Sequence, residues 1–140
     1  MESNVQVPVV SALIRNAFGQ FLLQQRADGY IPDADGKWEL TGGRMEFGEK
    51  PEDTIIRECL EEIGCQVRIL RLVPHVQSNM WERSDGSTAQ ALVICYEVEI
   101  IKGEPKAIDK KVAQVKWFSQ NEIKELNILP GILEFIKAIQ

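Results

Sequence analysis

The sequence has few of the residues that build zinc sites or disulfide frameworks. Among its 140 residues are one histidine and three cysteines. Cys59, Cys65 and Cys95 are odd in number and lack the spacing of a metal motif, which excludes a disulfide scaffold. We therefore expect three reduced cysteines in the core of a cytoplasmic protein. The single histidine, His75, is expected to lie on a strand and to have no catalytic role.

Positive charge is also scarce, since 16 lysines and arginines face 21 acidic residues for a net charge of −5. This balance argues against a nucleic-acid polymer as partner, although a nucleotide remains compatible because a bound metal ion can supply positive charge locally. No apolar run is long enough to cross a membrane. The N-terminal segment contains Glu2 and no basic cluster, so we expect no secretory signal. The length suits a single domain over residues 1–140.

The most informative stretch covers residues 42–65. It begins as a glycine-rich turn and continues into a predicted helix over residues 51–63, opened by a proline and followed by a glycine. Glu58, Glu61 and Glu62 are spaced three and four apart, so their carboxylates project from one helix face. A hard divalent cation would remove their mutual repulsion. A solvated acidic face is the alternative that this spacing alone leaves open.

The residues around these glutamates resemble the signature box of the Nudix hydrolases, position for position. Cysteines occupy two apolar positions of the box, and a buried free cysteine suits such positions. The resemblance implies a Nudix-type α/β/α sandwich with a mixed β-sheet and a loop-helix-loop that carries the box. It covers nearly the whole chain, but only the box is specific. The matching fixed positions are Gly43, Glu49, Arg57, Glu58, Glu61, Glu62 and Gly64.

The remainder of the chain is dominated by strand patterns. The first two strands are expected to form a hairpin across residues 16–20. Ser119 and Glu122 form a capping box at the start of a short helix over residues 121–126, and Pro130 opens a last amphipathic helix. Strands thus outnumber helices, which favours the α/β class, with a mixed sheet covered by helices on its two faces. Strands are predicted over residues 5–15, 21–26, 37–40, 66–81, 89–101 and 114–119.

The resemblance implies a reaction in which water attacks a phosphorus atom of a diphosphate linkage. Such reactions need charge neutralisation and positioning more than covalent help from the protein. The implied cofactor is Mg²⁺, with Mn²⁺ as the alternative, held by Glu58 and Glu62. Glu61 is a further ligand or supports the base, and the Gly42 carbonyl is a backbone ligand. Which glutamate deprotonates the water stays open, and Glu58 is the first choice.

Three further residues complete the implied catalytic and metal site. Arg57 is expected to orient Glu58 and Glu49 through bidentate hydrogen bonds, which its planar guanidinium suits. Many family members carry another glutamate before the last strand, whereas this chain has Lys111 in that region. Asp109 is the nearest acid and would substitute if the loop bends. A solvated loop aspartate is the alternative.

Substrate-binding residues are predicted outside the box. Arg26 ends the second strand, where similar Nudix enzymes have a basic residue that reaches phosphate, and a plain surface arginine is the alternative. A base pocket needs aromatic faces for stacking and amides that read the edges of the base. The candidates for that pocket are Phe47, Asn79, Trp81 and Asn127.

The preferred function is an Mg²⁺-dependent pyrophosphohydrolase that converts a nucleoside triphosphate, modified or not, to monophosphate and pyrophosphate. The short chain and the turn over residues 42–49 resemble the triphosphatase branch. Hydrolysis of ADP-ribose, another nucleotide sugar or a dinucleoside polyphosphate is the alternative, although a proline typical of the ADP-ribose branch is absent near Asn79. A catalytically silent nucleotide sensor is the non-enzymatic alternative, which the complete set of box glutamates disfavours. The expected partner is a small nucleotide or nucleoside diphosphate derivative, bound by a monomer or homodimer.

Overall fold

A computed structural model describes residues 3–140 of the chain. Glu2, on which the expectation about a secretory signal rests, lies outside these residues. Helix α1 has the bounds that the sequence predicts. The elements, in chain order, are β1 (Asn4–Ile14), β2 (Phe21–Arg26), the short 3₁₀ helix η1 (Pro32–Ala34), β3 (Trp38–Glu39), β4 (Thr41–Arg44), α1 (Pro51–Ile63), β5 (Gln66–Glu82), β6 (Thr88–Lys102), β7 (Val112–Phe118), α2 (Gln120–Ile123) and α3 (Ile132–Ala138).

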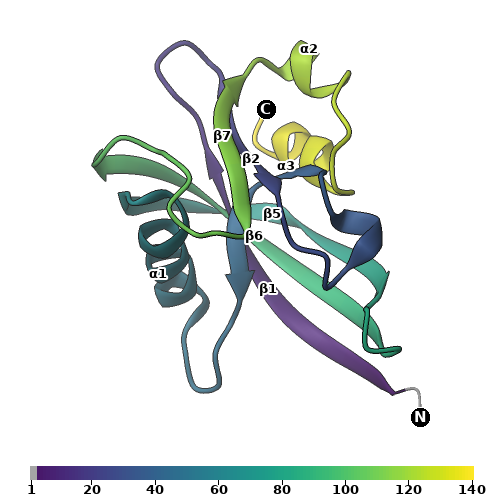
Figure 1. The fold of residues 1–140 in the computed structure, drawn as a ribbon. Helices are drawn as coiled ribbons and strands as arrows, with labels where there is room; N and C mark the ends of the chain where they lie inside the picture. The colour runs from purple at the N-terminus through teal and green to yellow at the C-terminus, as the bar shows by residue number, and fades with distance from the viewer. Residues whose placement is uncertain (1–2) are drawn as a thin grey trace.

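The strands form two sheets rather than one. The first has the order β4-β1-β6-β5 and is mixed, because β1 pairs in parallel with β6 while the other pairs are antiparallel. The second is antiparallel, with the order β3-β2-β7. Figure 1 shows α1 on one side of these strands and α3 on the other. This arrangement confirms the predicted α/β/α class with a mixed sheet.

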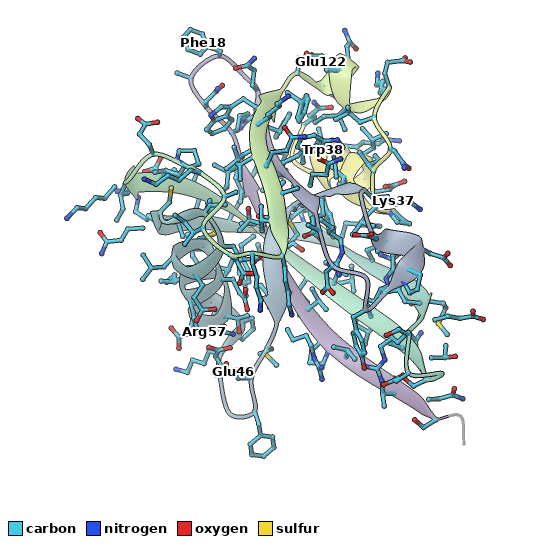
Figure 2. All side chains as sticks on the ribbon, viewed as in Figure 1. Phe18, Lys37, Trp38, Glu46, Arg57 and Glu122 are labelled. Atoms are coloured by element: carbon cyan, nitrogen blue, oxygen red, sulfur yellow. The ribbon has the colours of Figure 1, made fainter. Side chains whose placement is uncertain are left out.

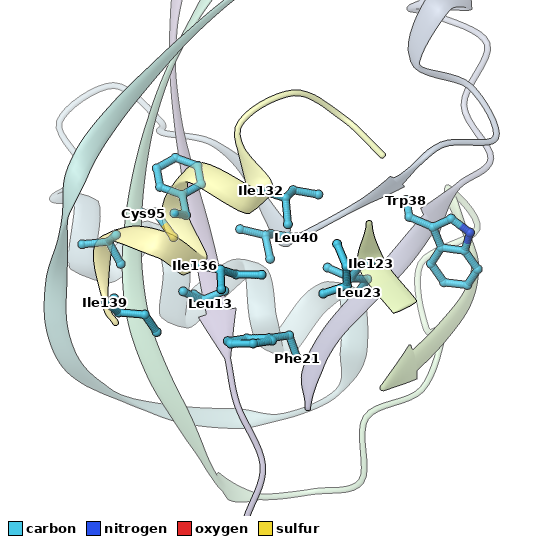
Figure 3. Close-up of a cluster of buried hydrophobic side chains, with 12 residues drawn as sticks. Leu13, Phe21, Leu23, Trp38, Leu40, Cys95, Ile123, Ile132, Ile136 and Ile139 are labelled. Carbon is cyan, nitrogen blue, oxygen red and sulfur yellow. The ribbon is translucent and has the colours of Figure 1, made fainter. Parts of the chain in front are cut away.

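Successive side chains on the central strands point to opposite faces of the sheet, and each face has its own hydrophobic core. On β1, Val10, Ala12 and Ile14 pack with the apolar face of α1, whose Ile55 and Cys59 are fully buried. The intervening Leu13 points to the opposite side, where α3 covers a second cluster (Figure 3). Because the strands are covered on both faces, the box helix is held on a rigid support. The three cysteines are free and buried, as predicted.

The predicted hairpin between the first two strands is wrong. Only an isolated bridge joins Arg15 to Phe21. Strand β1 is already flanked along its length by β6 on one side and, over residues 9–12, by β4 on the other. Pairing with β4 blocks the middle of the second edge, and β2 pairs instead with β3 and β7 in the second sheet. The chain therefore crosses between sheets at residues 16–20.

The C-terminal elements differ from prediction mainly in length. The capping box at Ser119 and Glu122 is present, but α2 extends only over Gln120–Ile123. Helix α3 begins at Ile132, after Gly131, so Pro130 precedes the helix rather than opening it. Within residues 3–140, none of the helices combines the length and the apolar character needed to traverse a bilayer.

Candidate active site

The backbone of β4 packs closely against β1 on one side and against the Glu58 side chain on the other. Strand β4 pairs with β1, with Gly42 opposite Ser11. A Cβ atom on Gly42 would lie 2.2 Å from the Val10 carbonyl oxygen, and one on Gly43 would lie 2.6 Å from the Glu58 carboxylate. Only glycine allows these approaches. Gly42 therefore lets β4 lie close to β1, and Gly43 lets the Glu58 side chain lie directly on the backbone of β4.

Arg57 links the loop before α1 to the carboxylates on the helix. Its Nε and Nη2 atoms donate to the two oxygens of Glu49, at 2.9 and 3.0 Å. Its Nη1 atom donates to Glu58 Oε1 at 2.9 Å and to Glu61 Oε2 at 3.3 Å. Figure 2 shows Arg57 of α1 near Glu46 of the loop before the helix. The guanidinium thus holds Glu49 in a bidentate pair and fixes one oxygen of Glu58.

Three hydrogen-bonding groups stabilise the negative charge of the Glu49 carboxylate. The Arg57 guanidinium, the Glu46 backbone amide and the Thr54 hydroxyl together lower the pKa of Glu49 to about 2. The same pair raises the pKa of Arg57 above its usual range, with Glu58 contributing. We call Glu49 and Arg57 the outer pair. Both residues are charged at neutral pH, and each satisfies the other.

Deeper in the site, Glu62 lies in a very different environment. Its Oε1 atom accepts from Gln24 Nε2 at 2.8 Å, and its Oε2 atom accepts from the Gly42 amide at 3.3 Å. Burial raises the pKa of Glu62 well above its usual range, and the nearby Glu39 and Glu58 carboxylates raise it further. Within residues 3–140, no lysine or arginine lowers the pKa of Glu62 in the way that Arg57 lowers that of Glu49. The Glu62 carboxylate is therefore buried beside other acids without a paired cation.

Glu39 is part of this inner site, and the sequence reasoning missed it. Its Oε2 atom accepts from Gln24 Nε2 at 3.0 Å and its Oε1 atom accepts from Arg26 Nη1 at 3.1 Å. Burial raises the pKa of Glu39, and Arg26 partly offsets that effect. One signal could have found it, namely a glutamate between Trp38 and Leu40, which are both buried. We call Glu39, Glu58 and Glu62 the inner carboxylates.

The inner carboxylates fit a hard divalent ion by the chemistry of their donors. Among residues 3–140, no three acidic, histidine or cysteine side chains are already arranged around one point as a closed metal cage. Mg²⁺ does not require such a cage, because it keeps several waters and binds through one or two carboxylates together with substrate phosphates. Glu58 and Glu62 could supply the carboxylates. An ion there would also provide the positive charge that burial of these acids demands.

Two adjoining hollows surround these residues. The first has a volume of about 380 Å³ and has mainly apolar walls from β1, β6 and α3. The second has a volume of about 650 Å³ and lies over the carboxylates of α1 and the loop before it. A molecule with an apolar ring and a polyphosphate chain matches the pair in shape and polarity. The residues that line both hollows are Arg26, Asp28, Glu39, Gly42, Gly43, Arg44 and Lys111.

A model of the NUDIX domain matches residues 5–139. The chain belongs to the Nudix family. This match confirms the enzyme class that the box predicts, a hydrolase.

Individual relatives of this Nudix chain are distant. It is 29% identical over 126 residues to a Mycobacterium tuberculosis protein provisionally named 8-oxo-dGTP diphosphatase 2, covering 90% of this chain and 82% of that protein. It is 27% identical over 129 residues to nucleoside triphosphatase NudI of Escherichia fergusonii, covering 88% and 89% respectively. The crystal structure of a MutT protein from Methanosarcina mazei superposes with a TM-score of 0.74 at 22% identity, over 96% of this chain and 92% of that one. That likeness supports the fold.

The structure brings most of the predicted Nudix site together. The box residues Glu49, Arg57, Glu58, Glu61 and Glu62 converge because one helix and the loop before it carry them. Their roles as metal ligands or base remain predictions. Glu61 stands apart from the inner carboxylates, because 55% of its side chain is exposed.

The predicted residues outside the box are more scattered. Arg26, Asn79 and Trp81 line the first hollow, and Asp109 lines the second. The Asp109 carboxylate accepts from the Lys111 amide at 2.8 Å, as in a loop turn. These placements are compatible with the predicted roles of all four residues.

Two of the predicted base-pocket residues are not brought to the apolar hollow. Phe47 is fully exposed at the tip of the loop before α1, where it borders only the second hollow. Asn127 is exposed and lines neither hollow, and its backbone carbonyl accepts from the Trp38 amide at 2.9 Å. Neither side chain therefore reaches the apolar hollow in which a base would stack.

Proposed function

We propose that this Nudix chain is a divalent-cation-dependent pyrophosphohydrolase that cleaves a nucleoside triphosphate, base-modified or not, to monophosphate and pyrophosphate. The observation that supports this most is the shared wall between the apolar hollow and the carboxylate-lined hollow. A base in the first hollow would direct its phosphates past Arg26 and Gly43 into the second. The phosphates would then lie beside Glu58 and Glu62.

Each residue has a distinct part in this proposal. Bound Mg²⁺ would neutralise phosphate charge and acidify a water molecule. Glu58 and Glu62 would hold the ion, and Arg57 would keep Glu58 in place through the hydrogen bond to its Oε1 atom. The other Glu58 oxygen, Oε2, is the atom that we assign to accept the proton of the attacking water. General-base assistance of this kind typically contributes about 10² to 10⁴ in rate.

Arg26 is the residue that we assign to phosphate binding. Its Nη1 and Nη2 atoms lie 3.1 Å from Glu39 and 3.5 Å from Asp28, respectively. Its Nε atom is buried and has no hydrogen-bond partner among residues 3–140, so a ligand would reach the guanidinium through Nη1 or Nη2. A phosphate oxygen entering between the two hollows would gain a charge-assisted hydrogen bond there.

The choice of a triphosphate is supported by the two relatives named after triphosphate hydrolysis, 8-oxo-dGTP diphosphatase 2 and NudI. The test is to incubate the purified chain with Mg²⁺ and a panel of nucleoside triphosphates, 8-oxo-dGTP, ADP-ribose and a dinucleoside tetraphosphate. Pyrophosphate and nucleoside monophosphate are expected from triphosphates, and EDTA should abolish both.

Three outcomes of this assay would contradict the proposal. Orthophosphate and nucleoside diphosphate as the direct products would mean cleavage at the terminal phosphate. Turnover of ADP-ribose alone would assign the alternative substrate class. Binding of nucleotides without turnover would make the chain a sensor. A Glu134→Gln variant, altered at an exposed position on α3, serves as the control for loss of a remote carboxylate.

A further inference from the structure

A glutamine lies at the centre of the inner carboxylates. Gln24 is on β2, and none of its surface is exposed. Its Nε2 atom donates both to Glu62 Oε1 at 2.8 Å and to Glu39 Oε2 at 3.0 Å. Its Oε1 atom accepts from the Thr41 hydroxyl at 2.9 Å. The amide thus joins a helix of the box to strands of both sheets.

The chemistry of these partners determines how the amide is oriented. A carboxylate that holds a metal ion is ionised, so it accepts hydrogen bonds and cannot donate them. The NH₂ group must therefore face Glu39 and Glu62, and the amide oxygen must face the Thr41 hydroxyl. Both amide hydrogens are used, and turning the amide over would place its oxygen against two carboxylates. In this orientation the Thr41 hydroxyl donates to the amide oxygen and holds it in place.

A purely structural role would not require a polar residue at this position. The residues before it on β2, Leu22 and Leu23, are buried and apolar. Burying an amide is costly unless its hydrogen bonds are made, and an apolar side chain of similar volume avoids that cost. The hydrogen bonds of Gln24 are made almost entirely to acids of the inner site, so its placement serves those acids.

We propose that Gln24, held in place by Thr41, is a positioning residue that keeps Glu62 and Glu39 in the arrangement that binds a divalent ion. This inference deepens the proposed function and rests on it. The Glu62 carboxylate has one oxygen on Gln24 and the other near the Gly42 amide, which restricts it to a single orientation. A carboxylate that is already oriented does not lose that freedom when the ion binds.

The experiment measures Mn²⁺ binding to the full chain by electron paramagnetic resonance, which detects free aqueous Mn²⁺ and needs no substrate. Gln24→Met keeps the volume and removes the hydrogen bonds. Loss of a residue that orients a metal ligand typically weakens metal affinity by about 10- to 100-fold, and we expect a loss in that range. In kinetic assays the Mg²⁺ concentration for half-maximal activity should rise, whereas KM for the nucleotide at saturating Mg²⁺ should not change.

Thr41 provides a second, milder test if Gln24→Met fails to fold. Thr41→Val removes the hydroxyl at nearly constant shape, and Thr41→Ser retains it. We expect weaker Mn²⁺ binding in Thr41→Val and binding close to wild type in Thr41→Ser. In a folded Gln24→Met background, Thr41→Val should have no further effect on affinity. Unchanged affinity in Thr41→Val, or in a folded Gln24→Met, would overturn the inference.

Failure of the proposed function would look different. If the wild-type chain does not bind Mn²⁺, or if Glu62→Gln binds it as tightly as wild type, the metal site itself is wrongly assigned. If wild type binds Mn²⁺ and Glu62→Gln does not, but the Gln24 and Thr41 variants bind normally, only the positioning role is wrong.

Discussion

The outer pair and the inner carboxylates, which form the two ends of the site, hold their negative charges in opposite ways. At the outer pair, Glu49 receives two hydrogen bonds from Arg57, and its pKa is lowered to about 2. At the inner end, burial beside Glu39 and Glu58 raises the pKa of Glu62. The outer pair is a finished ion pair. Among the inner carboxylates, Glu58 contacts Arg57 and Glu39 contacts Arg26, whereas Glu62 forms no ion pair within residues 3–140 and its missing partner is a cation.

This difference separates residues that stabilise the site from residues that perform its chemistry. A charge that is paired within the protein gains nothing further from a ligand. A buried acid without a paired cation lowers stability, and such groups persist mainly where function requires them. We therefore expect substitutions at the two ends to move activity and stability in different combinations.

The largest effect is expected from neutralising the inner carboxylates. Glu62→Gln or Glu58→Gln keeps the shape of the side chain but removes a ligand charge. Metal ions contribute several kcal/mol to transition-state stabilisation, so kcat/KM with a nucleoside triphosphate should fall by about 10³-fold. Steady-state kinetics at saturating Mg²⁺ measure this, with Glu134→Gln as the control. Activity within tenfold of wild type in both variants would show that the inner carboxylates do not hold the catalytic ion.

Stability without metal should change in opposite directions at the two ends. Burial raises the pKa of Glu62 to about 9, so above that pH Glu62→Gln removes a buried, unpaired charge. We expect its Tm there to exceed that of wild type by about 2 to 4 °C, the shift that about 1 kcal/mol produces in a domain near this size. Glu49→Gln breaks the outer pair and should lower Tm. Thermal unfolding in EDTA above pH 9 provides the comparison. A lower Tm in Glu62→Gln would mean that the ionised Glu62 carboxylate stabilises the fold, contrary to this prediction.

The pH dependence of stability should also divide between the two ends. The pKa of Glu62 is raised above its ordinary value of 4.5, so its contribution is fully present below that pH and is lost as pH rises. The pKa of Glu49 is lowered from 4.5 to about 2, so its contribution is present above 4.5 and is lost as pH falls toward 2. Unfolding curves in EDTA should show the alkaline loss in wild type and a smaller one in Glu62→Gln. Identical alkaline slopes would contradict the assignment.

The helix of the box could be predicted to the residue because its signals are local. Pro51 stands at its first position and Gly64 follows its last, where the backbone is left-handed with φ 71°. The spacing of the glutamates then places them on one face without reference to the rest of the fold. The hairpin could not be predicted in this way, because pairing of β1 depends on β4 and β6 competing for its edges.

The same distinction applies to the candidate site. Arg57 and the box glutamates meet because they are neighbours on α1. Gln24 and Glu39 come from strands of the second sheet, and only the tertiary arrangement brings them to Glu62. Their sole local signal is a polar side chain among buried apolar neighbours. Asn127 is a residue that the sequence predicts for the base pocket because of its amide, but the fold places it away from the hollow.

Glu61 offers the finest test of the comparison because it belongs fully to neither end. Like Glu49, it accepts a hydrogen bond from Arg57, although a weak one at 3.3 Å. Like Glu58 and Glu62, it lies on the acidic face of the helix. With 55% of its side chain exposed, water screens much of its charge. We therefore expect Glu61→Gln to reduce kcat/KM by less than about tenfold, equivalent to under about 1.4 kcal/mol, and to leave Tm nearly unchanged. A loss as large as that of Glu62→Gln would place Glu61 among the metal ligands and would extend the inner carboxylates to the exposed rim of the helix.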